Sequence, residues 1–286
     1  MFRSLVGVLI TAVIGAVAVQ PASAARIYGG QPKTGVPDEV VLALNDSGTA
    51  ITKLTFHLDV SCGTDFETVD AGTTQSVGAV PDRLMAGAHY LVRGRVAAGK
   101  LSGTIVGTDR YDATTWELMN VVLSGTASKT RAGGTMAVKF VRTDETSGAV
   151  LAQCDQTIRW SALRRPGVVY AGATSQNEPI VLELTRDRRH VSHAHVAWYA
   201  PCKAGGDWVA SHDEFDLQPF ALSRTGAFAR TYRYNLGQGS TEIERFAGRV
   251  GPAKAAGTFQ SAVTLAGTAG DDSCSTGSVS WAVSTG

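Results

Sequence analysis

Residues 40–44 of this 286-residue chain read VVLAL, and residues 180–184 read IVLEL. Aliphatic side chains occupy every second position of both stretches, so an extended backbone places them on one face. The offset between Cys62 and Cys202 along the chain equals the offset between these two stretches. Because the pattern and its spacing recur together, the sequence predicts β-strands that belong to a duplicated unit.

Three further pairs of similar segments keep the same order in both halves of the chain. They predict a β-domain at residues 26–163, a linker at residues 164–166 and a second β-domain at residues 167–286. Residues 94–105 (GRVAAGKLSGTI) resemble residues 125–136 and 248–259, which form one of these pairs. We therefore expect an extra hairpin near residues 94–112 of the first domain. The pairs are IYGG (27–30) with VYAG (169–172), GTASKTRAGGTM (125–136) with GRVGPAKAAGTF (248–259), and CDQTIRW (154–160) with CSTGSVSW (274–281).

The rest of the pattern indicates an all-β fold. No segment after residue 26 keeps a helical apolar period, and clusters of Gly, Asn, Asp and Ser interrupt the chain at short intervals. Short strands between frequent turns are typical of antiparallel sandwiches and barrels. We expect two tandem antiparallel β-sandwiches of the Ig-like, Greek-key kind, with small β-barrels as the alternative. The basic pairs Arg164-Arg165 and Arg188-Arg189 are interpreted as part of the linker and as a turn.

The first 25 residues are typical of a secretory signal peptide. Arg3 precedes an apolar run, residues 5–19, which is shorter than the roughly 20 residues that a membrane-spanning helix needs. Ala-Ser-Ala at residues 22–24 fits a cleavage site. We therefore expect a secreted, extracellular protein without stable membrane insertion after cleavage.

The charge balance excludes a general affinity for polyanions. The chain has 26 basic and 25 acidic residues, and removing the segment that contains Arg3 makes the formal charge zero. Such a chain lacks the long-range positive field of nucleic-acid-binding proteins. We expect no nucleic-acid partner.

Each predicted domain contains two cysteines at corresponding positions. In a secreted chain, such pairs are typical of structural disulfides. Four cysteines allow three pairings, and the duplication selects Cys62 with Cys154 and Cys202 with Cys274. The chain contains no Cys-x2-Cys spacing of the kind that zinc sites use.

The sequence contains none of the common catalytic motifs. It has no G-x-S-x-G, H-E-x-x-H or G-x-x-x-x-G-K-[ST] segment. His193, His195 and His212 are the candidate ligands of a surface divalent metal, because two histidines two residues apart on a strand lie about 6.5–7 Å from each other. The alternative is that they are solvated surface histidines, and we expect no other cofactor.

Aromatic residues in the second half suggest a stacking surface. Trp208, Tyr232 and Tyr234 are candidates for contacts with a sugar ligand, and the alternative is that they pack in the core. Glu242 and Glu244 share a strand face. We interpret them as exposed residues on the outer face of a strand. Paired glycosidase carboxylates must instead face each other across a cleft.

The second domain resembles a known kind of exported domain. The resemblance rests on Tyr170-x-Gly172, Cys202 and the run from Cys274 to Trp281, Cys-x-Thr-Gly-x-Val-x-Trp. This arrangement is similar to a β-rich domain of secreted actinobacterial proteins, which occurs alone or in tandem and for which we know no activity. The resemblance implies an exported β-domain and no catalytic residues. The first domain departs from the motif, since Asp-Gln-Thr follows Cys154.

These features favour a secreted, non-enzymatic binding or structural protein of the extracellular space or the cell envelope. Its expected partner is an envelope polysaccharide or another extracellular protein. The alternative is a secreted hydrolase or metal-dependent enzyme with a site in the second domain or at the domain interface. A cleft lined by His, Asp or Glu would favour the enzyme, whereas an exposed aromatic face would favour binding.

Overall fold

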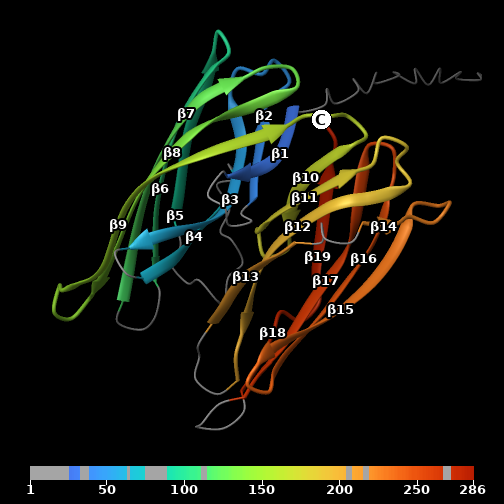
Figure 1. Ribbon diagram of the computed structural model, residues 1–286. Helices are drawn as coiled ribbons and strands as arrows, with labels where there is room; N and C mark the ends of the chain where they lie inside the picture. Colours follow the sequence, from blue (N-terminus) through green and yellow to red (C-terminus); the bar gives the residue numbers. More distant parts are fainter. Residues whose placement is uncertain are drawn as a thin grey trace, which may run out of the picture.

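The computed structural model describes the chain from residue 26 to residue 286 with seven gaps (Figure 1). The described residues form β-strands joined by turns and loops, which confirms the all-β class. They contain no helix that is long and apolar enough to cross a membrane. The signal peptide expected at residues 1–25 lies outside them. The described ranges are 26–32, 39–62, 65–74, 89–110, 115–203, 208–214, 219–266 and 272–286.

The first domain is one antiparallel sheet of nine strands, paired in the order β4-β3-β2-β1-β9-β8-β7-β6-β5. Each strand lies beside the next one along the chain, and the sheet curls until β5 lies against β3 and β4. The strands are β1 (Arg26–Pro32), β2 (Glu39–Leu44), β3 (Ile51–Cys62), β4 (Asp65–Thr74), β5 (His89–Ala97), β6 (Lys100–Arg110), β7 (Thr115–Ala127), β8 (Arg131–Asp144) and β9 (Val150–Leu163).

The second domain repeats this arrangement in a sheet of ten strands. Its main path is β13-β12-β11-β10-β19-β17-β16-β15, with β14 beside β12 and β18 beside β17. The strands are β10 (Val169–Thr174), β11 (Pro179–Leu184), β12 (His190–Pro201), β13 (Trp208–Glu214), β14 (Phe220–Ala221), β15 (Ala227–Gly237), β16 (Ser240–Val250), β17 (Lys254–Leu265), β18 (Asp272–Ser275) and β19 (Val279–Ser284).

Both sheets close nearly into barrels, and two antiparallel β-domains are confirmed. The strand order is the up-and-down meander of the barrel alternative rather than a Greek key. Within each domain all the described strands belong to a single sheet, so the chain does not cross to a second sheet. Inward and outward residues alternate along the strands of both architectures, and the sequence pattern alone therefore does not distinguish them.

The alternating aliphatic side chains point into the barrels. Val40, Leu42 and Leu44 of β2 are at most 1% exposed and belong to the core of the first barrel. Ile180 and Leu182 of β11 have the same position in the second barrel. The strand face that the sequence pattern predicts therefore fills each interior.

A buried tyrosine makes the same hydrogen bond in each domain. Tyr28 of β1 donates its hydroxyl to the Ser128 carbonyl in the β7–β8 turn, over 2.7 Å. Tyr170 of β10 donates its hydroxyl to the Gly251 carbonyl in the β16–β17 turn, over 2.8 Å. Both tyrosines are fully buried. The recurrence of this bond supports the duplication in three dimensions.

Paired glycines make room for a core tryptophan. Gly248 of β16 and Gly257 of β17 are partners in the sheet. A Cβ atom at either glycine would collide with the indole ring of Trp281. Gly125 and Gly134 are partners at the corresponding place in the first domain. These repeated glycines therefore serve packing in the sheet rather than turn formation.

The hairpin near residues 94–112 has a shorter counterpart in the second domain. Ala50 forms a bridge with Arg95 of β5, as His190 does with Ala221 of β14. The two-residue strand β14 is thus the equivalent of the end of β5. The hairpin is longer in the first domain but is not an addition to it, and its last two residues lie outside the described part.

The two barrels pack against each other through the outer faces of corresponding strands. β1 lies against β10, and β2 lies against β11. The contact is an apolar cluster that includes Val41, Ala171 and Val181. A Cβ atom at Gly29 would come within 2.9 Å of the Ala171 Cβ, so the backbones approach closely. Because β2 is buried on both faces, its sequence is almost continuously apolar.

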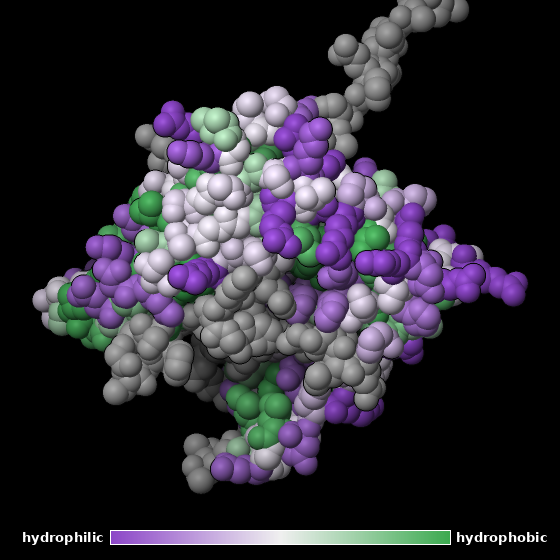
Figure 2. All heavy atoms as spheres, turned by 45° about the horizontal axis from the view of Figure 1, so that its top comes forward, coloured by the Kyte–Doolittle hydropathy of each residue, from purple (hydrophilic) through white to green (hydrophobic). Residues whose placement is uncertain are grey.

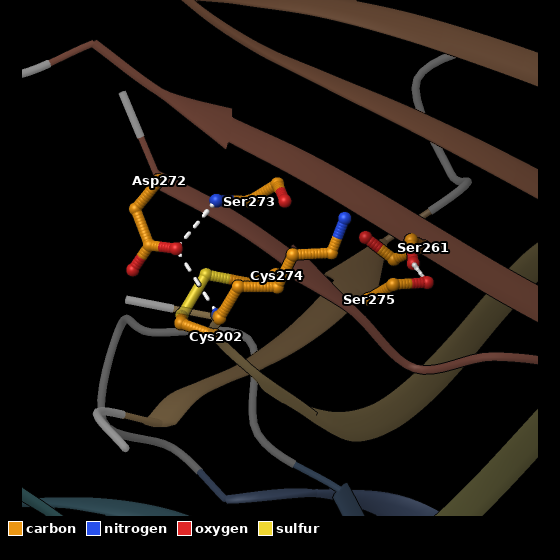
Figure 3. Close-up of a disulfide and its surroundings, with 7 residues drawn as sticks. Cys202, Ser261, Asp272, Ser273, Cys274 and Ser275 are labelled. Atoms are coloured by element: carbon orange, nitrogen blue, oxygen red, sulfur yellow. Dashed lines mark hydrogen bonds between the residues drawn. A yellow bond between two sulfur atoms is a disulfide. The ribbon is translucent and has the colours of Figure 1, made fainter. Parts of the chain in front are cut away.

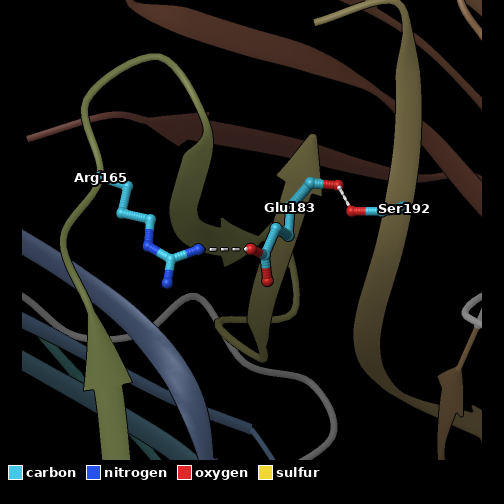
Figure 4. Close-up of polar contacts among 3 residues, drawn as sticks. All are labelled: Arg165, Glu183 and Ser192. Carbon is cyan, nitrogen blue, oxygen red and sulfur yellow. Dashed lines mark hydrogen bonds and ion pairs between the residues drawn. The ribbon is translucent and has the colours of Figure 1, made fainter. Parts of the chain in front are cut away.

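The linker contacts both barrels. Arg164 donates from Nη1 to the Lys129 carbonyl of the first domain, over 3.2 Å. Arg165 forms an ion pair of 3.2 Å with Glu183 of β11, whose carbonyl accepts a hydrogen bond from the Ser192 hydroxyl (Figure 4). The Arg165 side chain is 54% exposed. Such an ion pair adds little stability, so the apolar cluster is the main contact between the domains.

Replacing Tyr28 or Tyr170 by Phe removes a hydroxyl and leaves a turn carbonyl without this donor. We expect each substitution to lower the free energy of unfolding by about 1–2 kcal/mol, measured by urea denaturation. Tyr234→Phe is the comparison and should lower it less than either of these substitutions does, because Tyr234 is 36% exposed and water can replace the partners of an exposed hydroxyl. Equal effects at all three positions would contradict a specific role of the buried hydroxyls.

Candidate functional site

The predicted histidine cluster divides between two environments. β12 carries His193 and His195 with ring centroids 6.3 Å apart. His193 is exposed, but His195 is only 5% exposed and lies at the domain interface. The expectation of solvated surface histidines is therefore wrong for His195. The side chains of His212 and Trp208 lie outside the described part of the structure, so the three-histidine metal site stays a prediction.

His195 faces a buried carboxylate of the first domain. Its Nδ1 lies 3.6 Å from Oε1 of Glu39, which is fully buried at the start of β2. His57 of β3 pairs in register with Glu39 and is also buried. A catalytic acid or base must come within reach of its substrate, whereas these residues are at most 5% exposed. The polar groups of the interface therefore fit a structural role better than the predicted alternative of an interface enzyme site.

The predicted stacking tyrosines lie beside carboxylates. The rings of Tyr232 and Tyr234 are stacked with centroids 6.4 Å apart, and Tyr232 packs against the core. Both pair in register with glutamates of β16. Glu244 is 2% exposed, and Glu242 accepts a hydrogen bond of 2.7 Å from the Ser261 hydroxyl. The interpretation of these glutamates as exposed residues on an outer strand face is therefore wrong. Part of the interior of the second barrel is polar.

The Cys202–Cys274 disulfide is present and joins the end of β12 to β18 (Figure 3). This confirms the pairing expected in the second domain. Cys154 is buried and also disulfide-bonded. The side chain of Cys62 lies outside the described residues, so the pairing of Cys62 with Cys154 stays a prediction.

Cys202, Cys274 and Asp272 are the one group of metal-ligating residue types that lie close enough to share an ion among the described residues. Both sulfur atoms are in the disulfide and are not thiolates. The Asp272 carboxylate accepts a hydrogen bond from the Lys203 amide over 3.0 Å. The group therefore fastens two chain segments and does not fit a metal.

A pocket opens at the end of the second barrel where three turns meet. Its volume is about 930 Å³, within the range of about 300–1,000 Å³ that is usual for small-molecule sites. The turns are β11–β12 (residues 185–189), β14–β15 (residues 222–226) and β16–β17 (residues 251–253). Figure 2 brings the upper end of the molecule forward, and hydrophilic side chains gather there around hydrophobic ones.

The pocket combines basic side chains with apolar ones. No acidic residue lines it, and none of its three arginines forms an ion pair with a carboxylate of the described residues. This combination attracts an anion by charge and offers the planar donors of arginine for a carboxylate or phosphate. The basic lining residues are Arg188, Arg189, His190 and Arg224, and the larger apolar ones are Leu184, Leu222, Val250 and Pro252.

Arg188 has a backbone conformation that is unfavourable for its residue type. Its φ is +59°, in the left-handed region. The corresponding residue of the first domain is Gly48, with φ +72°, in a turn closed by the same backbone hydrogen bonds. Arg188 donates from Nη2 to the Tyr170 hydroxyl over 3.2 Å and to the Pro252 carbonyl over 3.4 Å. A strained arginine at a pocket, where the duplicate has glycine, points to a binding role.

The acidic residue of this turn, Asp187, stabilises the turn itself. Its Oδ1 accepts hydrogen bonds from the Thr185 hydroxyl over 2.6 Å and from the Arg189 amide over 3.1 Å. These two bonds hold the pKa of Asp187 below its usual value, and the nearby charges of His190 and Arg189 act in the same direction. Asp187 does not line the pocket, so the lining contains three arginines and no carboxylate.

The sequence predicts a turn at Arg188-Arg189 and indicates no function for the pair. The turn is present between β11 and β12. The informative signal is a difference between the duplicated segments, because residues 188–190 read Arg-Arg-His where residues 48–50 read Gly-Thr-Ala. Comparing the two halves position by position would have found it.

Comparison of the chain with known proteins gives no match to a protein-family model, a curated protein or a solved structure. The resemblance to an exported actinobacterial domain therefore stays a prediction.

Replacing both Cys202 and Cys274 by Ser removes a bridge between residues that are 72 positions apart. The chain-entropy model gives a loss of about 4 kcal/mol in the free energy of unfolding, because the unfolded chain gains freedom. Urea denaturation of the variant and of the unreduced protein measures the difference. A loss below about 1 kcal/mol would contradict this structural role.

Two substitutions of Arg188 separate its backbone strain from its side-chain contacts. Arg188→Ala and Arg188→Gly both remove the guanidinium, but only glycine accepts a positive φ without strain. We expect the glycine variant to be more stable than the alanine variant by about 1 kcal/mol in urea denaturation. An alanine variant that is equally or more stable would show that the turn is not strained.

Proposed function

We propose that this chain is an exported, non-enzymatic binding protein whose second domain takes an anionic small molecule or acidic group in the pocket at the end of its barrel. The observation that carries the proposal is the strained Arg188, which stands at the pocket where the duplicated turn has Gly48. Residues in unfavourable backbone conformations cluster at functional sites.

The distribution of positive charge supports this function. Arg188 and Arg224 belong to different turns and line the same pocket, so a ligand between them meets positive charge from two sides. Arginine side chains bind and orient carboxylates and phosphates through several hydrogen bonds at once. The basic groups of the pocket therefore suit binding of an anion better than nucleophilic or acid–base attack on a substrate.

The disulfide supports the proposed export of the protein. Disulfides form and persist in oxidising compartments such as the bacterial periplasm and the extracellular space. The Cys202–Cys274 bridge is buried on the Cys274 side. Among the partners expected from the sequence, an envelope polymer with acidic groups suits this pocket better than a neutral polysaccharide does.

A panel of anions tests the proposal by thermal unfolding. Sulfate, inorganic phosphate, citrate and dodecanoate are each added to the purified protein, and a bound anion raises Tm because it stabilises the native state. We expect at least one of them to raise Tm in a concentration-dependent way. The rise should disappear in the variant with Arg188→Ala and Arg224→Ala.

Arg159→Ala is the matched control, since it removes an exposed arginine of β9 in the first domain, far along the chain from the pocket. It should keep the rise in Tm. The proposal is wrong if no anion raises Tm, or if the control loses the effect as fully as the pocket variant does.

A further inference from the structure

We infer that the ligand of this pocket is an amphipathic anion, a molecule with an aliphatic chain and a terminal carboxylate or phosphate. This inference rests on the proposed anion-binding function and specifies the chemical class of the ligand. It comes from the way in which apolar and basic side chains are distributed within one pocket.

The apolar part of the pocket is continuous with the core of the barrel. Leu184 and Val250 line the pocket and belong to the core cluster, at 3% and 8% exposure. Leu222 lines the pocket and packs against the same cluster. A hydrocarbon chain placed there would lose contact with water against side chains that are already fixed by the core, which favours binding.

The aromatic residues next to this apolar part are densely packed. Phe220 and Phe228 have ring centroids 5.0 Å apart, and Phe228 and Phe246 are also 5.0 Å apart. Close-packed side chains of this kind resist rearrangement. The ligand therefore occupies the end of the barrel above the core rather than its interior.

The polar part of the pocket consists of cations more than of uncharged donors. The hydroxyls of Ser223 and Thr225 are hydrogen-bonded to each other over 3.1 Å, and Ser223 Oγ also accepts the Ala227 amide over 2.9 Å. Because the turn uses these hydroxyls, the pocket is poorly suited to a neutral polyol such as a sugar. Arg188 and Arg224 offer charge-assisted donors instead, which match an acidic head group.

The corresponding turn of the first domain has no matching run of basic residues. Residues 48–50 are Gly-Thr-Ala instead of Arg-Arg-His, and a Cβ atom at Gly48 would collide with the guanidinium of Arg26. The space beside the turn is thus filled by a side chain of the domain itself. We expect one ligand per chain, bound by the second domain.

Isothermal titration of the purified full-length protein tests the inference with four monomeric probes used below their micellar concentrations. These are dodecanoate, dodecyl phosphate, inorganic phosphate and dodecyl maltoside. We expect the two charged amphiphiles to bind with one site per chain and at least about tenfold more tightly than the other two probes, which is about 1.4 kcal/mol.

Two variants assign the two parts of the ligand to the two parts of the pocket. Arg224→Ala should weaken dodecyl phosphate about tenfold or more, because it removes a charge-assisted donor. Leu222→Ser should weaken dodecyl phosphate but leave the affinity for inorganic phosphate unchanged. Leu222 is only half-buried, and circular dichroism shows whether both variants keep the β-fold.

The other outcomes separate this inference from the function on which it rests. Inorganic phosphate binding as tightly as dodecyl phosphate would overturn the amphipathic ligand and leave the anion pocket intact. Dodecyl maltoside binding as tightly as dodecanoate would overturn the role of charge. Failure of every probe to bind would count against both proposals.

A sedimentation experiment with lipid vesicles distinguishes a free amphiphile from a lipid in a membrane. Vesicles of phosphatidylcholine with phosphatidic acid are sedimented with the protein. We expect the protein to stay in the supernatant, because the pocket takes single molecules. The alternative result is that the protein sediments with these vesicles, that Arg224→Ala abolishes the sedimentation, and that monomeric dodecyl phosphate does not bind. This result would overturn the inference of a free ligand in favour of a lipid head group.

Discussion

The hydroxyl of one buried tyrosine in each domain connects the first strand to a turn between two later strands. Tyr28 and Tyr170 come from strands that open their domains, and they donate to carbonyls of the β7–β8 turn and the β16–β17 turn, respectively. The hydroxyl satisfies a polar group at the end of an apolar interior, where an unpaired carbonyl is costly. In the second domain the same hydroxyl also accepts a hydrogen bond from Arg188. The proposed site thus depends on a bond that the fold already requires.

The sequence predicted the parts of the structure that follow from local pattern. Alternation at residues 40–44 and 180–184 placed the core-facing side chains correctly, and the duplication selected the Cys202–Cys274 pair. It did not separate a barrel from a sandwich, since both use the same alternation. Strand order depends on how neighbouring strands pair, and a single-strand pattern carries no information about that.

The residues of the candidate sites were harder to predict because their environment comes from distant parts of the chain. His195 lies on the outer face of its strand, where a side chain of an isolated domain would be exposed to solvent. In this chain the first domain covers His195, and Glu39 lies beside it. Glu244 alternates like a surface residue and is buried in the interior. The role of Arg188 is indicated by its positive φ and by the comparison with Gly48 at the corresponding position. Neither periodicity nor composition contains that information.

The packing of β1 on β10 and of β2 on β11 brings equivalent residues of the duplicate together. Gly29 meets Ala171, its counterpart, and Val41 shares a cluster with its counterpart Val181. Residues near the axis of a twofold-symmetric dimer contact their own counterparts in this way. In this respect the contact between the two domains is like that of a twofold dimer whose subunits are covalently joined. In a true dimer every substitution appears twice, whereas here Arg188 appears once, so one unit can specialise while the other only supports it.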